Sequence, residues 1–309
     1  MKKILILLST YNGHKYIREQ LDSLYSQKDV NIHILVRDDG SKDDTIEILK
    51  GYQHKYGKMT IYAEENVGAA MSFHRLMAYA YADFPNYDYY AFSDQDDVWL
   101  EEKLSVAVSQ LAKNQGDIYY CNAYITDANL NKIAELGVVR NLCLQYLMFR
   151  QPALGCTQVM TYQYFSFCTQ LFRDYIHKNP PLIELHDVWT MLISQMIGVK
   201  VIVDDNAHIL YRQHTNNVTS HKKENVMQKL RRVSKRAHKH KGYAYSNLRI
   251  IGELLKNQLA SNALDVLNRM YEYKNSILKT ISFALYMQGY FKSLSIKAMV
   301  IYRIIYRLY

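Results

Sequence analysis

The chain has 309 residues, of which 49% are apolar and 22% are charged, a composition that supports a large buried core and excludes global disorder. No two of its four cysteines lie closer than 12 residues, so no CxxC spacing indicates zinc, and reduced cytosolic thiols are expected. The net charge is +9, but residues 221–309 carry +14 and residues 1–220 carry −5, which indicates that the C-terminal region meets something anionic.

The first hundred residues alternate between strand-like and helix-like patterns. Short apolar runs predict strands at 4–8, 32–36, 59–63 and 89–92. Helical spacing of apolar residues predicts helices at 15–25, 44–56 and 69–81. Strands separated by helices indicate an α/β fold with a mostly parallel sheet. The glycine-rich GxGxxG fingerprint of dinucleotide-binding folds is absent from the sequence.

Beyond residue 100 the pattern is mixed, and it becomes helical after about residue 221. Helices are expected at 103–112 and 188–197, and strands at 118–125 and 200–203. We predict a domain boundary near 220, with one domain in 1–220, whose two halves meet near residue 100, and a basic helical region in 221–309. The N-terminal apolar run is too short for a signal peptide, and no run of 18 uncharged apolar residues predicts a membrane span.

An acidic cluster follows the predicted strand 89–92, in the segment 92–99 (FSDQDDVW). The carboxylates of Asp94, Asp96 and Asp97 fall within four residues, where they repel one another unless a cation lies among them. Oxygen ligands suit a hard ion such as Mg²⁺ or Mn²⁺. The alternative is a solvated acidic turn.

Polar clusters end three of the predicted strands: the segments 9–13 (STYNG), 37–41 (RDDGS) and 94–97 (DQDD). In a parallel sheet these three segments lie at the same edge, where ligands bind. Three such clusters at successive strand ends are much rarer by chance than one, so the sequence predicts a functional cleft there.

These residues resemble a known family. The segments 9–13, 38–41, 66–68 and 94–97 are similar to the nucleotide-sugar-binding half of family 2 glycosyltransferases with the GT-A fold, and the resemblance covers about residues 1–220. The segment 92–99 more particularly resembles the rhamnosyltransferases of bacterial cell-wall and capsular polysaccharides. Two later segments extend this resemblance, 185–189 (LHDVW) and 211–218 (YRQHTNNV).

The resemblance implies a nucleotide-binding pocket. Asp39 would accept the N3–H of a pyrimidine, which selects uracil or thymine because cytosine has no N3–H, and Asp38 would support the same loop. Thr10 and Tyr11 would line the base pocket. The full set that it implies for the nucleotide is Ser9, Thr10, Tyr11, Asp38, Asp39, Asn66, Gly68, Arg75 and Asp94. For Arg75 a solvated position on a helix is the alternative.

The resemblance also implies a cation that bridges the diphosphate. Asp96 would be a direct ligand, Asp94 would contact the ribose or a metal-bound water, and His214 would be a third ligand or a diphosphate contact. Which of Asp94, Asp96 and Asp97 touches the Mn²⁺ or Mg²⁺ directly stays open.

Asp187 is the candidate general base of an inverting transferase, which takes the proton of the acceptor hydroxyl. Taken alone, an Asp at this position favours a role as the N-cap of the helix that follows it, and the family resemblance reverses that preference. Members of the family commonly carry Glu before this Asp, whereas this chain has His186, as in the rhamnosyltransferase-like subset. The residues implied at the diphosphate or acceptor are Arg212, His186 and Trp189. We interpret Cys156 as a packing residue, because no base neighbours it in the sequence.

The resulting hypothesis is an inverting, metal-dependent glycosyltransferase that moves rhamnose from dTDP-rhamnose to a cell-surface polysaccharide or a lipid-linked oligosaccharide. A UDP-hexose or UDP-N-acetylhexosamine donor is the alternative within the same fold. A sugar-1-phosphate nucleotidyltransferase is disfavoured, because the segment 9–13 has one glycine and no basic residue. The alternative of another class is a non-catalytic nucleotide-sugar or glycan-binding subunit.

The basic region 221–309 is expected to anchor the protein on the anionic inner face of the plasma membrane, which makes the expected location cytoplasmic and peripheral. The alternative is a helical subdomain that packs on the catalytic body or forms a homodimer. Nucleic-acid binding is not expected, because no recognised motif accompanies the positive charge.

Overall fold

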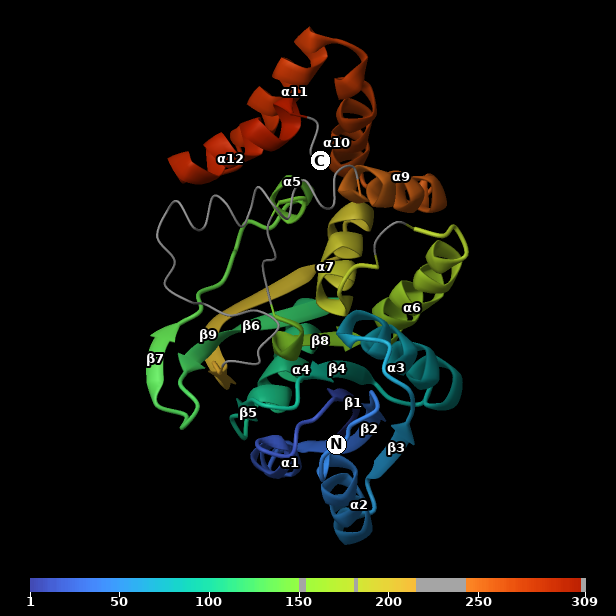
Figure 1. Ribbon diagram of the computed structural model, residues 1–309, viewed down its shortest axis with the longest axis vertical. Coiled ribbons are helices and arrows are strands. Elements are labelled where there is room, and N and C mark those ends of the chain that lie inside the picture. The colour runs from blue at the N-terminus through green and yellow to red at the C-terminus, as the bar shows by residue number, and fades with distance from the viewer. Residues whose placement is uncertain (150–153, 181–182, 215–242, 307–309) are drawn as a thin grey trace.

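The computed structural model describes residues 1–149, 154–180, 183–214 and 243–306 (Figure 1). Its centre is a nine-stranded sheet with the strand order β3-β2-β1-β4-β8-β6-β9-β5, and β7 pairs with β6. The strands are β1 (Lys2–Thr10), β2 (Val30–Asp38), β3 (Met59–Ala63), β4 (Tyr89–Ser93), β5 (Val98–Trp99), β6 (Ile118–Thr126), β7 (Lys132–Glu135), β8 (Gln158–Thr161) and β9 (Val201–Arg212).

The α/β fold expected from the sequence is confirmed, and the parallel order holds for β1 to β4. The second half of the sheet is mixed, not mostly parallel. Strand β8 runs antiparallel to both β4 and β6, whereas β9 is parallel to β6 and antiparallel to β5. Strands β5, β7 and β8 have two to four residues each, too short to give a readable apolar pattern.

Helices cover both faces of the sheet, and the sheet separates the hydrophobic core into two clusters, one on each face. They are α1 (Ile17–Tyr25), α2 (Thr45–Tyr56), α3 (Ala69–Asp83), α4 (Lys103–Asn114), α5 (Leu144–Leu147), α6 (Tyr162–Ile176), α7 (His186–Ile197), α9 (Tyr243–Leu255), α10 (Ser261–Glu272), α11 (Ile277–Gln288) and α12 (Leu294–Ile305).

Side chains of β1 alternate between the two clusters, because successive residues of a strand point to opposite faces of the sheet. Leu5 and Leu7 pack with α3, α6 and α7, whereas Ile4 and Ile6 pack with α1, α2 and α4. Every apolar residue of the run 4–8 is fully buried. The apolar run that predicted this strand is therefore the signature of burial on both faces, as expected for a central parallel strand.

The C-terminal region is helical where the structure describes it, as expected. Apolar side chains of α9 to α12 belong to the same core cluster as those of α3, α6 and α7. Figure 1 shows α10, α11 and α12 at the end of the molecule opposite α2. The predicted boundary near 220 and the basic run 222–241 lie outside the described residues. Among the helices that the structure describes, none is long and apolar enough to cross a bilayer.

His74 of α3 makes the stability of this core depend on pH. Its ring stacks on Phe172 at 3.5 Å, and its Nε2 donates to the carbonyl oxygen of Glu184 at 2.8 Å. Burial lowers the pKa of His74 to about 4. Because an unfolded histidine titrates near pH 6.5, the unfolded state binds more protons below that pH, and the stabilising contribution of neutral His74 is lost as the pH falls toward 4.

We expect His74→Gln to reduce the loss of stability between pH 7 and pH 4 by about 3 kcal/mol relative to the unmodified protein. Urea unfolding at the two pH values measures the difference. His54→Gln, on the outer side of α2, is the matched control and should keep the original loss. An equal loss in the His74 variant and the control would contradict this assignment.

Candidate active site

A cleft of about 420 Å³ opens where β1, β2 and β4 end. These strand ends meet because β1 lies between β2 and β4 in parallel register. The lining residues also come from the starts of α3 and α7 and from the segment before β8, and they are Ser9, Thr10, Tyr11, Asp39, Asn66, Gly68, Ala69, Phe73, Asp94, Gln95, Asp96, Leu154, Gly155, Leu185, His186, Asp187 and Tyr211. The structure thus brings together all three polar clusters that the sequence places at strand ends.

Asp38 organises the turn after β2. Its carboxylate accepts hydrogen bonds from the hydroxyl of Thr10 at 2.9 Å and from the backbone N–H of Ser41 at 2.8 Å. The hydroxyl of Ser41 also donates to it. The side chain is buried, and these contacts agree with the loop-supporting role that the resemblance implies for Asp38.

Asp39 faces the cleft in a fixed orientation. Its Oδ1 accepts from Arg37 Nη1 at 2.5 Å and from the N–H of Val67 at 2.8 Å, and its Oδ2 accepts from the N–H of Gly68 at 2.9 Å. Gly68, the N-cap of α3, has φ +82°, a backbone conformation that glycine adopts without the steric cost of a Cβ. Since each carboxylate oxygen accepts two hydrogen bonds, Oδ2 retains a position for a ligand N–H.

Arg37 holds Asp39 and was not singled out from the sequence. Its guanidinium is fully buried and also donates to Glu64 at 3.0 Å, to the hydroxyl of Ser72 at 3.0 Å and to the carbonyl of Glu65 at 2.9 Å. An arginine next to two aspartates in an otherwise apolar strand was the available signal, because a charged residue in such a strand is buried only when it is paired.

Gln95 connects the acidic segment to the end of β1. Its Oε1 accepts from the backbone N–H of Tyr11 at 2.8 Å, and its Nε2 donates to the carbonyl of Tyr11 at 3.1 Å. Gly13 leaves room for this side chain, because a Cβ at residue 13 would lie 2.3 Å from Gln95 Oε1 and would displace the amide. These two hydrogen bonds fix the backbone of Tyr11 while its ring remains half exposed at the cleft, where it can stack on a base.

The acidic segment divides between the cleft and the core. Asp94 and Asp96 line the cleft, whereas Asp97 is fully buried and accepts from the N–H of Arg212 at 3.1 Å. Burial, together with the charges of Asp96 and Asp187, raises the pKa of Asp94 to about 7. Burial and the neighbouring carboxylates also raise the pKa of Asp97 well above its usual range.

The donor set fits a divalent cation. Ligand atoms of Asp94, Asp97 and Cys156 lie within 4.8 Å of one another, and Asp96 Oδ2 lies 2.8 Å from His214 Nε2. The buried Oδ2 of Asp97 has no hydrogen-bond partner among the described residues. Repelling carboxylates and an unsatisfied buried oxygen are the conditions that a bound cation relieves, and carboxylate oxygens favour Mn²⁺ or Mg²⁺. Burial and the nearby carboxylates raise the pKa of the Cys156 thiol well above its usual range, so the thiol stays protonated and is a poor ligand.

A buried lysine lies behind this acidic segment. Lys103 is fully buried at the start of α4, with its Nζ 3.1 Å from the centre of the Trp99 ring. Burial lowers the pKa of Lys103 to about 8, and the nearby charge of Asp97 opposes that shift. No pattern in the sequence indicated a role for Lys103, since a lysine in the first turn of a helix is ordinarily solvated.

Asp187 lies in the first turn of α7 and lines the cleft. The N-cap of α7 is Leu185, so Asp187 is not the cap residue that its position in the sequence also allowed. Its Oδ1 accepts from the N–H of Val188 at 2.7 Å. The positive end of the helix dipole stabilises a carboxylate at this position, whereas the nearby Asp94 opposes ionisation of the pair.

His186 forms an aromatic wall beside Asp187. Its ring stacks on Phe73 at 3.6 Å and meets the edge of Phe92 at 4.4 Å. Burial lowers the pKa of His186, which keeps the imidazole neutral. Gly155 makes this packing feasible, because a Cβ at residue 155 would lie 2.2 Å from His186 Nε2.

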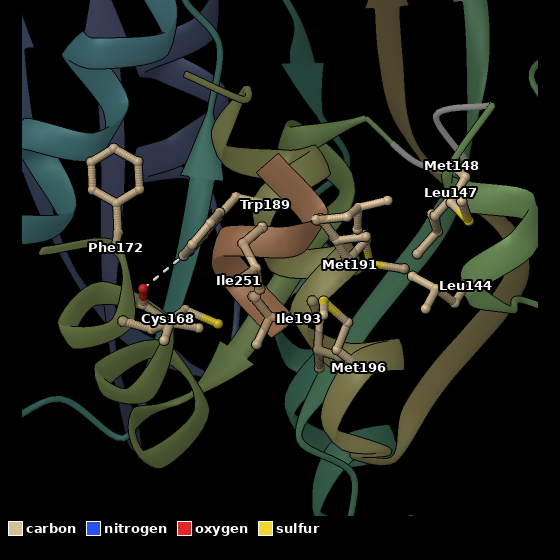
Figure 2. Close-up of a cluster of buried hydrophobic side chains, with 14 of the residues drawn as sticks. Leu144, Leu147, Met148, Cys168, Phe172, Trp189, Met191, Ile193, Met196 and Ile251 are labelled. Atoms are coloured by element: carbon tan, nitrogen blue, oxygen red, sulfur yellow. Dashed lines mark hydrogen bonds between the residues drawn. The ribbon is translucent and has the colours of Figure 1, made fainter. Parts of the chain in front are cut away.

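Three residues expected at the ligand are engaged elsewhere. The guanidinium of Arg212 is buried and donates to the carbonyl of Asp96 at 2.8 Å and to Glu19 at 2.8 Å. Arg75 lies outside the cleft lining and pairs with Glu64 at 3.2 Å. The expected contact of Trp189 with the diphosphate or acceptor needs correction, because this side chain is fully buried and its indole N–H donates to the carbonyl of Cys168 at 3.0 Å (Figure 2).

The family model for glycosyl transferase family 2 matches residues 5–178. The chain belongs to this family. The dTDP-rhamnosyl transferase RfbG of Shigella flexneri is 32% identical to this glycosyltransferase over 218 residues, which cover 68% of this chain and 72% of RfbG. The Escherichia coli protein WfgD, a UDP-Glc:α-D-GlcNAc-diphosphoundecaprenol β-1,3-glucosyltransferase, is 28% identical over 156 residues, which cover 50% of this chain and 58% of WfgD.

Solved structures support the GT-A fold of this glycosyltransferase. The S. aureus TarS 1–349 structure in complex with UDP has a TM-score of 0.55 at 17% identity and covers 92% of this chain and 75% of TarS 1–349. The mannosyltransferase PcManGT from Pyrobaculum calidifontis, in complex with GDP-Man and Mn²⁺, has a TM-score of 0.52 at 14% identity and covers 99% of this chain and 80% of its own.

The family match includes the residues around Asp39 and Asp96 but ends before Asp187. No role for Asp187 or His214 therefore follows from the family match.

Two arginines that both pair with Glu64 test how the pocket is stabilised. Arg37→Ala leaves Asp39 buried without its cation, so we expect a loss of about 3–5 kcal/mol in the free energy of unfolding. Arg75→Ala removes a partly exposed pair and should cost less than about 1 kcal/mol. Urea unfolding measures both losses. Similar values for the two variants would show that Arg37 does not stabilise the pocket around Asp39.

Proposed function

We propose that this glycosyltransferase transfers a sugar from a pyrimidine nucleoside diphosphate donor to a hydroxyl of a glycan or lipid-linked oligosaccharide, with inversion at the anomeric carbon. The observation that carries the proposal is that one cleft contains Asp39, the pair Asp94 and Asp96, and Asp187. These residues supply a base-reading carboxylate, a charged diphosphate region and a proton acceptor.

In the proposed reaction Asp187 accepts the proton of the acceptor hydroxyl. The acceptor oxygen forms a bond to the anomeric carbon while the bond from that carbon to the diphosphate oxygen breaks, and its electron pair leaves with the nucleoside diphosphate. The place of Asp187 at the N-terminus of α7 supports this role, because the helix dipole favours its ionised form before the reaction.

Asp94 and Asp96 would hold a Mn²⁺ or Mg²⁺ ion, with His214 beside Asp96. When bound, such a cation neutralises charge that develops on the leaving diphosphate. The Mn²⁺ in the PcManGT structure supports this assignment.

A thymine or uracil nucleotide is the proposed donor base. Asp39 Oδ2 retains one acceptor position toward the cleft, which suits a pyrimidine N3–H. Similarity to the dTDP-rhamnosyl transferase RfbG favours dTDP-rhamnose. A UDP-hexose or UDP-N-acetylhexosamine is the second candidate, favoured by WfgD and by the TarS complex with UDP-GlcNAc.

Further contacts to the substrates follow from the lining of the cleft. His186 lies beside Asp187, which supports its predicted place at the acceptor side. Arg212 and Trp189 support the acidic segment and α7 instead. For the region 221–309 we propose a peripheral contact with the anionic inner face of the plasma membrane, with a homodimer as the alternative.

The variant Asp187→Asn tests the proposed base. It should lower kcat by about 10²- to 10⁴-fold, because the amide cannot accept the proton, and leave the affinity for the donor unchanged. Asp174→Asn, on the exposed side of α6, is the control and should retain full turnover. Ordinary turnover by the Asp187 variant would remove this residue from the mechanism.

A thermal-shift screen tests the donor. With Mn²⁺ present, dTDP-rhamnose should raise the Tm more than UDP-glucose, UDP-N-acetylglucosamine or GDP-mannose, because a ligand that binds only the folded state stabilises it. CDP is the matched control for the base and should give a smaller shift than UDP. Addition of EDTA should reduce the donor shift, and a CDP shift equal to that of UDP would contradict the role of Asp39.

A further inference from the structure

The hairpin of α11 and α12 is apolar on two sides. On its inner side Phe283, Met287, Val300 and Ile304 are buried in the core of the protein. A surface helix ordinarily pairs one buried apolar face with a polar outer face, whereas a helix that is apolar all round meets a second apolar environment.

The outer side of this hairpin exposes large apolar residues. Leu278 is 80% exposed and Leu294 is 82% exposed, so these side chains contribute little to the packing of the described chain. We call this set the outer face, and its members are Ile277, Leu278, Ile281, Leu285, Leu294, Tyr302, Ile305 and Tyr306. On α11 the residues 277, 281 and 285 follow at intervals of four. On α12 Leu294 and Tyr302 lie two such intervals apart, with the small exposed Ala298 between them, and Ile305 and Tyr306 follow within the next turn, so each set forms one stripe.

The positive charge of the segment that contains α11 and α12 indicates which kind of surface it binds. Residues 277–309 contain five Lys and Arg, five Tyr and no Asp or Glu. Lys292, Lys297 and Arg303 lie on or beside the two helices. Exposed leucines and isoleucines, cationic side chains and tyrosines within one short segment match the interfacial region of an anionic bilayer, where the apolar groups enter the acyl boundary and the cations meet lipid phosphates.

A second copy of the chain fits this surface less well. A two-fold contact brings the same surface of both copies together, so it would place two segments with five cations each against one another. Neither segment contains an acidic residue, although Lys279 is paired with Glu272 of α10 at 2.8 Å. Anionic lipid supplies the missing negative charge. The basic run 222–241, with nine Lys and Arg and one Glu, has the same preference.

We propose that the outer face of α11 and α12 docks on an anionic lipid surface and inserts its leucine and isoleucine side chains at the interface. This inference deepens the membrane contact of the proposed function and assigns it to defined residues. The contact is peripheral, since no described helix is long and apolar enough to span a bilayer. It would hold the protein at the surface where a lipid-linked acceptor resides.

The test uses the full chain and vesicles of 30% phosphatidylglycerol and 70% phosphatidylcholine, with pure phosphatidylcholine vesicles for comparison. Flotation should show binding to the anionic vesicles that weakens as salt increases. The triple variant Leu278→Ser, Ile281→Ser, Leu285→Ser should bind at least about tenfold more weakly, because it removes apolar groups that enter the interface. Its Tm should stay close to that of the unmodified protein, since these side chains are exposed.

The matched control is the double variant Ile133→Ser, Leu264→Ser, which removes exposed apolar residues from β7 and α10 and should bind like the unmodified protein. Lys292→Glu together with Lys297→Glu should weaken binding to anionic vesicles without reducing the Tm. Equal binding by the triple variant and the control would overturn the proposal, as would a chain that does not float at all. A dimer in the absence of vesicles that the triple variant loses would assign the outer face to a second copy.

The vesicle experiment contains no donor and measures no turnover, so its failure leaves the proposed transfer reaction intact. Conversely, the triple variant should retain transfer to a water-soluble acceptor analogue, because none of its three residues lines the cleft.

Discussion

Repulsion between carboxylates is the constraint on which the cleft depends. Asp94, Asp96 and Asp187 converge at one edge of the sheet, where burial, together with the charges of Asp96 and Asp187, raises the pKa of Asp94 to about 7. A folded protein keeps such a group only where other interactions compensate for the repulsion. Here the compensation comes from helix N-termini, from backbone N–H groups and from buried arginine and lysine side chains, so that several elements of the fold contribute to one site.

Three carboxylates in and beside the cleft, those of Asp39, Asp187 and Asp97, are each stabilised in a different way. Asp39 is held by a buried guanidinium and two N–H groups at the start of α3, and Asp187 lies at the N-terminus of α7. Asp97 receives the N–H of Arg212, with Lys103 nearby. The surfaces that meet the donor are therefore fixed before any ligand arrives, which reduces the reorganisation needed on binding.

Sequence patterns predicted those parts of the site that depend on neighbouring residues in the chain. The apolar run in β1 and the polar residues after it placed one wall of the cleft, because strand ends in a parallel sheet share an edge. The predicted strand 200–203 was too short: β9 continues through Asp204, whose carboxylate is satisfied by the hydroxyl of Tyr119 at 2.9 Å and by His208 at 3.2 Å. Two adjacent aspartates, here Asp204 and Asp205, favour the prediction of a turn. The hydrogen bond of Asp204 with Tyr119 on the neighbouring strand is visible only in the structure.

The residues that were misassigned or overlooked in the sequence have a second feature in common, which is that their roles depend on how the helices and strands pack. Trp189 was expected at the ligand from its place in a motif, but the periodicity of α7 turns it into the core two residues after Asp187. The overlooked residues are Arg37, Gln95 and Lys103, and their partners lie 2 to 84 residues away along the chain. Their supporting roles depend on contacts that form only in the folded state. The motif identified the family, whereas the supporting residues required three-dimensional contacts.

Arg212 links three segments that lie far apart in the sequence. Its single guanidinium donates to Glu19 of α1, to the backbone carbonyl of Asp96 and to the carbonyl of Ala128 after β6 at 2.6 Å. The guanidinium is a rigid planar group that donates in fixed directions, so this one side chain sets how the acidic segment lies against α1 and the end of β6.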